Sequence, residues 1–151
     1  RRVFSFRLGD VRVLFPGSVD EAVACAFGHA WVHHFNLAGN IAVGRDMRES
    51  SPALHDSLVD GLLGSGLNVI DLGLCATELG YFASTLDNVE AAIVVTASHN
   101  PPDYNGFKVV LKNGKALTYN DGLFDIMKLM LGGHTNSKPR GAMVQRDIHG
   151  A

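Results

Sequence analysis

A short segment between two apolar runs holds the residues of this sequence that are best suited to chemistry. It reads Thr96-Ala97-Ser98-His99-Asn100-Pro101-Pro102-Asp103-Tyr104-Asn105-Gly106. The two prolines each fix φ near about −65°, and Asn105-Gly106 permits left-handed turns, so the loop can hold the Ser98 hydroxyl in one place. A hydroxyl held in this way suits a nucleophile. His99 and Lys108 are then available for proton transfer and for neutralising an anion.

The composition of this segment also has a plainer explanation. Ser, Asn, Pro and Gly are the residues that any sharp connection between two elements requires, so spacing alone leaves both interpretations open. A serine hydrolase is the less attractive form of the catalytic interpretation. Ser98 and His99 are sequence neighbours, which seldom present their side chains to each other, and no G-x-S-x-G elbow surrounds the serine.

The elements around this loop alternate between apolar strands and amphipathic helices. Helices are predicted over 18–35, from a Ser18-x-x-Glu21 capping box, from Ser51-Pro52 to Gly64, over 79–85 and over 121–131. Buried strands are predicted over 40–44, 67–72, 91–95 and 107–111, and Asn113-Gly114 predicts a hairpin turn. This order predicts an α/β fold of three layers, αβα, in which helices cover both faces of a mixed, mostly parallel four-stranded sheet.

The loop therefore leaves the carboxyl end of a strand, which is where open α/β sheets bind their ligands. Residues 1–131 are expected to form one domain. The last twenty residues, 132–151, carry Gly132-Gly133, Pro139 and Gly141 and are predicted to be a linker.

Length and charge bound the classes of function. The chain has 151 residues with 13 basic and 15 acidic side chains, and a net charge of −2 offers no general field for nucleic acid or an anionic membrane. No apolar run approaches the roughly 20 residues that cross a bilayer, which predicts a soluble protein. Cys25 and Cys75 lack the spacing of a metal knuckle or a disulfide framework, so a reducing cytoplasm is expected.

Three further groups of residues have competing interpretations. Asp46 and Arg48 could face a cleft, but an ion pair beside the helix start at Ser51 is the favoured interpretation. Arg7 suits a solvated surface as well as a ligand contact. His29 and His33 share a helical face, yet no carboxylate or cysteine completes a metal-ligand set, so metal binding there is disfavoured.

The segment from Thr96 to Lys108 resembles the phosphoserine loop of the α-D-phosphohexomutases, the phosphomannomutase and phosphoglucomutase family. Three other segments resemble motifs of the same family, in the same order along the chain: Phe6-Arg7-Leu8-Gly9-Asp10-Val11-Arg12, Val43-Gly44-Arg45-Asp46-Met47-Arg48-Glu49-Ser50-Ser51 and Gly73-Leu74-Cys75-Ala76-Thr77-Glu78. The four together span most of the chain. Gly9 and Val13 stand where the family signature has tyrosine and glycine.

This resemblance implies domain I of a four-domain cytoplasmic isomerase that interconverts hexose 1-phosphate and hexose 6-phosphate, of mannose, glucose or both. Ser98 would carry the phosphoryl group, and hexose 1,6-bisphosphate would be the intermediate and activator. His99 and Lys108 would transfer protons, Arg12 would steady the phosphoryl group, and the expected phosphate contacts are Arg7, Asn100 and Asn105.

The family also uses Mg²⁺, which here would meet a phosphoryl oxygen on Ser98 and aspartates of a second domain. Hexose phosphates and the remaining domains of the same polypeptide are the expected partners, with no nucleic acid and no membrane. The isolated chain is expected to be inactive. The alternative, based on Gly9 and Val13, is a phosphosugar-binding or interaction domain without turnover.

Overall fold

One mixed sheet runs through the part of the chain that the computed structural model describes, residues 4–7, 10–14, 21–49, 51–96, 104–116 and 122–145. Its strands are β1 (Phe4–Arg7), β2 (Asp10–Leu14), β3 (Asn40–Arg45), β4 (Asn68–Leu74), β5 (Ala91–Val95), β6 (Tyr104–Leu111), β7 (Lys115–Ala116) and β8 (Met143–Gln145). The helices are α1 (Glu21–Phe35), α2 (Ser51–Gly64), α3 (Thr77–Ala83) and α4 (Leu123–Leu131). The strand order is β1-β2-β6-β5-β3-β4-β8, with β7 paired to β6.

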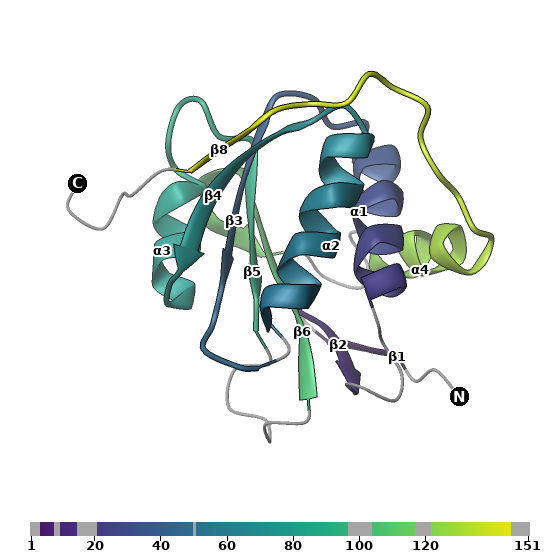
Figure 1. Ribbon diagram of the computed structural model, residues 1–151, viewed down its shortest axis with the longest axis horizontal. Coiled ribbons are helices and arrows are strands. Elements are labelled where there is room, and N and C mark those ends of the chain that lie inside the picture. Colours follow the sequence, from purple (N-terminus) through teal and green to yellow (C-terminus); the bar gives the residue numbers. More distant parts are fainter. Residues whose placement is uncertain are drawn as a thin grey trace.

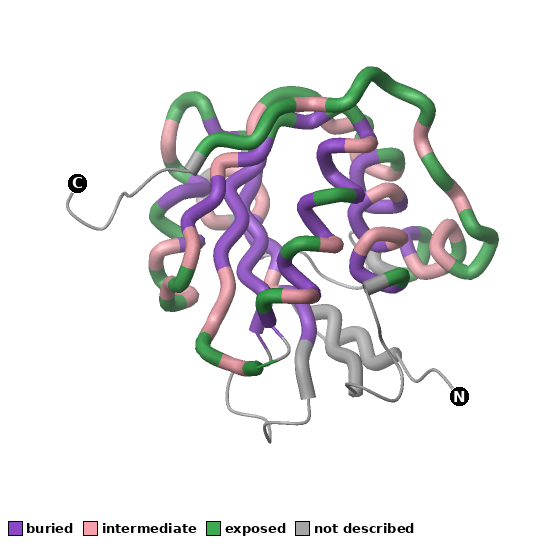
Figure 2. The backbone as a smooth tube through the Cα atoms, viewed as in Figure 1, coloured by how far each residue is buried: buried purple, intermediate pink, exposed green. Residues whose placement is uncertain are grey.

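The parallel part of the sheet follows from the apolar runs of the sequence. β3 pairs in parallel with β4 and with β5, and every residue of β5 is buried, as Figure 2 shows for the centre of the sheet. Strands buried on both faces are expected to be continuous apolar runs. The predicted strands 40–44 and 91–95 are confirmed. The predicted strand 67–72 is displaced to 68–74, because a register shift after Val43 carries the pairing on to Leu74.

The antiparallel part is wider than the sequence analysis expects. β6 pairs antiparallel with β5, and β2 then pairs with β6 and β1 with β2. The described sheet therefore has eight strands instead of four. Asn113-Gly114 makes the predicted turn, with Gly114 at a φ of 82°, and leads from β6 through the short 3₁₀ segment Lys112–Gly114 into β7.

Helices cover both faces of the sheet, which confirms the predicted αβα layers (Figure 1). On one face, α1, α2 and α4 enclose the larger core, where the rings of Phe27 and Phe107 stack with centroids 5.0 Å apart. On the other face, α3 packs against β5 and β3 around the smaller core of Ala42, Leu72, Ala83, Val89 and Ala92.

The four predicted helices are all present, with some differences at their ends. The second runs from Ser51 to Gly64 as predicted, whereas the third lies at 77–83 instead of 79–85. Its first turn contains Thr77 and Glu78, which precede the apolar residues that indicated the helix. Ser18 and Asp121, the predicted starts of the first and last helices, lie outside the described residues.

The C-terminal segment, which the sequence predicts to be a linker, contains a strand of the sheet. Residues 134–142, which we call the strap, run from α4 across the α1–α2 layer (Figure 1). Met143–Gln145 then form β8, which pairs in parallel with β4. The strap can pass close to β4 because Gly141 has no side chain: a Cβ at this position would lie 1.7 Å from the Leu67 carbonyl oxygen. The Gly141 N–H donates to the Leu63 carbonyl at 2.9 Å.

Candidate functional site

The carboxyl ends of the parallel strands meet at one edge of the sheet, where the predicted catalytic segment begins and ends. Arg45 at the end of β3 is opposite Val95 at the end of β5, and Val95 is opposite Phe107 in β6. The Thr96 N–H donates to the Gly106 carbonyl at 2.9 Å. This bond closes the base of the connection from β5 to β6. The predicted residues Ser98, His99 and Asn100 belong to that connection and lie outside the described residues.

Two of the predicted catalytic residues are brought together by strand pairing. Arg12 in β2 is opposite Gly106 in β6, and Lys108 is two residues further along β6, about 7 Å at the rise of a strand. Arg12 and Lys108 are distant in the sequence, so only the β2–β6 pairing makes them neighbours on adjoining strands.

The remaining predicted phosphate contacts occupy positions on the same antiparallel strands. Arg7 is opposite Asp10 where β1 meets β2, and Asn105 in β6 is opposite Val13 in β2. Asp10 is in turn opposite Lys108. The register thus places Arg7 one strand further from the β5–β6 connection than Arg12.

Lys108 lies on the α3 face of the sheet. Its neighbours Phe107 and Val109 are in the core on the other face, and alternation along a strand turns Lys108 away from them. It is opposite Val94, whose Cγ2 would lie 2.6 Å from a Cβ built on Gly80 of α3. The Lys108 side chain is partly exposed, and within the described ranges it has no ion-pair partner. Its ammonium can therefore serve an anion at this edge.

The loop after β3 braces the same edge through Asp46. The Asp46 Oδ1 atom accepts hydrogen bonds from the Ser51 hydroxyl at 2.5 Å and the Arg48 N–H at 3.1 Å. Its Oδ2 atom forms an ion pair with Arg48 Nε at 3.2 Å, which confirms the favoured interpretation of these two residues. The Asp46 N–H donates to the Val95 carbonyl at 3.0 Å. The start of α2 and the end of β5 are thus tied to one loop.

A buried histidine and carboxylate at the end of β4 were missed by the sequence analysis. His55 Nε2 lies 3.0 Å from Asp71 Oδ1, and both side chains are almost fully buried. Asp71 Oδ1 also accepts the Gly73 N–H at 2.8 Å, where Gly73 has a φ of 69°. The pair therefore fixes the irregular end of β4. The available signal was Asp71 itself, because a carboxylate in a buried strand requires a partner.

The cysteine that follows β4 packs tightly against β3. The Cys75 N–H donates to the Arg45 carbonyl at 2.9 Å, and a Cβ built on Gly44 would lie 2.3 Å from Cys75 Sγ. Burial raises the pKa of the Cys75 thiol, and the nearby Asp71 and Asp46 carboxylates raise it further, against the Arg45 N–H and guanidinium. A thiol in this state is a packing group rather than a nucleophile.

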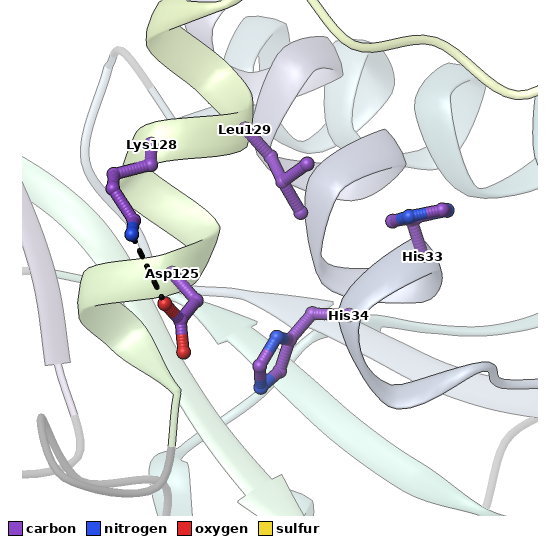
Figure 3. A pocket seen from close by; sticks show the side chains of 5 residues that line it. All are labelled: His33, His34, Asp125, Lys128 and Leu129. Atoms are coloured by element: carbon purple, nitrogen blue, oxygen red, sulfur yellow. Dashed lines mark ion pairs between the residues drawn. The ribbon is translucent and has the colours of Figure 1, made fainter.

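A cavity of about 390 Å³ lies elsewhere, between the last turn of α1 and α4. Its lining includes His33, His34, Asp125, Lys128 and Leu129, and Figure 3 shows the His34 ring extending toward Asp125, which is paired with Lys128 at 3.6 Å. The last turn of α1 leads into the amino end of β3. The cavity therefore lies away from the edge that holds Lys108, and we do not assign it to the same site.

The described residues hold no group of three or more His, Cys, Asp or Glu side chains that could bind a metal ion. His29 Nδ1 accepts the Asn136 N–H at 3.1 Å, and the His33 ring packs on His134 with centroids 4.1 Å apart. The described part of this chain therefore does not form a complete Mg²⁺ site.

None of the described helices is long and apolar enough to cross a membrane.

Comparison with known proteins extends over most of the chain. Residues 4–130 match the family described as phosphoglucomutase/phosphomannomutase, alpha/beta/alpha domain I. A phosphomannomutase from Escherichia coli is 40% identical over 124 residues, which are 82% of this chain and 27% of that protein. A probable phosphoglucosamine mutase from Pyrococcus abyssi is 49% identical over 113 residues, 75% of this chain and 25% of that protein.

The fold agrees with a solved structure of the same family. A crystal structure of a phosphoglucomutase/phosphomannomutase family protein from Burkholderia thailandensis superposes with a TM-score of 0.85 and 33% identity, covering 95% of this chain and 33% of that one. The chain thus spans about a quarter to a third of the length of these relatives. From the match over residues 4–130 and the shared αβα fold, this chain belongs to the phosphoglucomutase/phosphomannomutase family and corresponds to its domain I.

Proposed function

We propose that this chain is the part of a phosphohexomutase that carries the phosphoryl group, on Ser98. The observation that carries the proposal is the match to domain I over residues 4–130, a range that contains the whole segment from Thr96 to Lys108. Its supporting geometry is the sheet edge at which that segment starts and ends, with Lys108 on β6 and Arg12 on β2, opposite Gly106 and two residues along from the pair that Asp10 makes with Lys108. The substrates are hexose 1-phosphates and hexose 6-phosphates.

The reaction consists of two phosphoryl transfers. In the first, the Ser98 Oγ–P bond breaks and a bond forms between phosphorus and the free hydroxyl oxygen of the hexose monophosphate. The hydroxyl proton passes through a base to the serine oxygen, which leaves a hexose 1,6-bisphosphate and an unmodified serine. In the second, the other phosphoryl group returns to Ser98 Oγ and the isomeric monophosphate is released.

Charge explains why cations at this edge support the proposal. A phosphoserine carries about −1.5 to −2 charges at neutral pH, in a chain whose net charge is already −2. Lys108 and Arg12 would offset that charge, with Arg7, Asn100 and Asn105 as further phosphate contacts. Phosphoryl transfer relies on positioning and charge stabilisation, so Lys108 and His99 need only neutralise charge and move the hydroxyl proton.

Mg²⁺ would neutralise further charge on the transferring phosphoryl group. From this chain it would meet a phosphoryl oxygen on Ser98, and its other ligands would come from outside these residues. Because the chain spans only 27% of the Escherichia coli relative, the rest of the active site is proposed to lie in further domains of the same polypeptide, in the cytoplasm.

The test is the intact mass of the full-length polypeptide purified from cells. We expect the mass to exceed the sequence mass by one phosphoryl group, and the excess to disappear in Ser98→Ala. Ser57→Ala, on α2, is the matched control and should keep the extra mass. Incubation with a mannose, glucose or glucosamine monophosphate should transfer the phosphoryl group from Ser98 to the sugar and remove the extra mass. The sugar that does so identifies the substrate, since relatives of this chain are named for different sugars.

The opposite result would favour the alternative of a binding domain without turnover. That result is an unmodified Ser98 in the full-length protein together with saturable binding of a hexose phosphate. Mutase turnover by residues 1–151 alone would contradict the proposed division of the active site between domains.

A further inference from the structure

The strap is anchored to the helical layer through a small polar cluster around His29 of α1. The Asn136 N–H donates to His29 Nδ1 at 3.1 Å, and the Asn136 side-chain amide donates to the His29 carbonyl at 3.0 Å. The same amide donates to the Ser65 hydroxyl oxygen at 2.9 Å, and Ser65 is almost fully buried. His29, Ser65 and Asn136 come from three separate segments, so the cluster joins α1, the end of α2 and the strap.

The bond to His29 Nδ1 requires that nitrogen to be unprotonated. A backbone N–H can only donate, so Nδ1 must present its lone pair to Asn136. Ser65 Oγ also lies 3.0 Å from Nδ1, and it donates to the Gly61 carbonyl at 2.7 Å. When Nδ1 gains a proton it can donate to Ser65, but the Asn136 N–H then loses its acceptor and faces another N–H. Protonation of this one ring therefore removes the backbone anchor of the strap.

Titratable and charged groups surround His29 from every element packed against it. Its own helix contributes Cys25 and His33, and α2 contributes Asp60, which is paired with Arg140 of the strap at 2.8 Å. The strap also brings Lys138 beside Gly66. His134 stacks on the His33 ring, and its Nε2 lies 2.9 Å from Asn136 Oδ1. A positive charge on the His29 ring is therefore left without a free carboxylate partner among these groups, because Asp60 is already paired with Arg140.

We propose that His29 is a pH-sensitive latch, which holds the part of the strap around Asn136 on the fold while its ring is neutral and releases it in acid. The end of the strap and β8 keep contacts of their own, through the Gly141 bond to Leu63, the Ala142 N–H, which donates to Asn68 Oδ1 at 2.9 Å, and the pairing of β8 with β4. The latch is independent of the phosphoryl chemistry proposed for Ser98.

The direction of the proton equilibrium agrees with this geometry. Burial lowers the pKa of His29 from its ordinary value of 6.5, and the positive charge of His134 lowers it further, against the opposing effect of Asp60. The folded state therefore binds this proton less readily than the unfolded chain. The stabilisation is complete above about pH 6.5 and is lost as the pH falls through the lowered pKa of His29.

The test is residue-resolved hydrogen exchange of the 151-residue chain at about pH 7.5 and about pH 5, corrected for intrinsic exchange. We expect the protection of the Asn136 amide to fall by about tenfold in acid, while amides in β3 and β5 change by less than about twofold. His29→Asn places an amide oxygen, which does not titrate, at the δ position. In that variant the Asn136 protection should be retained at both pH values.

Two outcomes would overturn the latch. One is equal protection of Asn136 at both pH values in the unaltered chain, or an undiminished acid response in His29→Asn. The other is a loss of protection in β3 and β5 in step with Asn136, which would be global acid unfolding. His34→Asn is the matched control, because it removes a histidine ring from the same helix, five residues further along and outside the cluster, and it should keep the full acid response.

Discussion

Replacing Gly61 by alanine should destabilise the protein by about 2 kcal/mol, although alanine is the better helix former by about 1 kcal/mol. A Cβ at Gly61 would lie 2.4 Å from the Cys25 carbonyl oxygen and 3.1 Å from its carbonyl carbon. Both atoms belong to the backbone of α1, so they cannot rotate away as a side chain would. The two helices would have to separate, and the core between them would lose contact.

The matched control lies on the same interface. A Cβ at Gly28 would meet the backbone of Gly61, Leu58 and Leu62 at 3.2 Å, which requires a shift of only a few tenths of an ångström. We expect Gly28→Ala to stay within about 1 kcal/mol of the unaltered chain, because the gain in helix propensity offsets the tighter contact. The prediction that Gly61→Ala is less stable than Gly28→Ala is therefore sharper than either predicted change in the free energy of unfolding.

Urea and thermal unfolding followed by circular dichroism measure both variants. A loss of about 2 kcal/mol corresponds to a fall in Tm of about 4–8 °C for a chain of this length. If Gly61→Ala is as stable as the unaltered chain, the helices separate at little cost and the reasoning from close backbone contact is wrong.

Two further perturbations test contacts that hold the loops of the sheet. Lys112→Met removes an ammonium that donates to the Leu86 and Val89 carbonyls, each at 2.6 Å, and should lower the free energy of unfolding in urea by about 1–2 kcal/mol. The control Lys128→Met breaks an exposed ion pair and should lower it by less than about 0.5 kcal/mol. Equal effects of the two variants would contradict the assigned role of Lys112. Asp46→Ala removes the acceptor for Arg48 and for the Ser51 hydroxyl, and should lower the free energy of unfolding in urea by about 2 kcal/mol. An unchanged unfolding midpoint would show that the loop after β3 does not depend on this carboxylate.

Local signals explain the parts of the fold that the sequence predicted well. Ser51-Pro52 begins α2 and Gly64 ends it, and both signals lie within the helix that they delimit. The all-apolar run of β5 likewise needs no distant partner to be recognised. Even the close approach at Gly28 was foreseeable, because a glycine inside a helix sacrifices stability unless another backbone needs the space.

Elements that depend on distant partners were missed. β8 has three residues and forms only because the strap delivers it to the edge of β4. β1 and β2 did carry a signal, since Phe4 and Phe6 alternate with polar residues, as do Val11 and Val13, but that alternation was interpreted only as part of a motif.

The candidate site divides in the same way. The segment around Ser98 was singled out through its resemblance to a family motif, and its catalytic role stays a prediction, whereas the approach of Arg12 to Lys108 requires the pairing of β2 with β6, which no local pattern specifies. The His55–Asp71 contact joins α2 to β4, so Asp71 signalled the need for a partner but nothing local identified His55 as that partner.

The pairing of β2 with β6 also sets an order of events during synthesis. Within the described part of the chain β2 pairs with β1 and with β6, and β6 is made only after three helices and three further strands. Until then the β1–β2 hairpin has no sheet to join, and isolated hairpins are at best marginally stable in water. Contacts between such distant parts of a chain form slowly. The nascent polypeptide must therefore hold the β1–β2 hairpin without its partner strand until β6 has been translated.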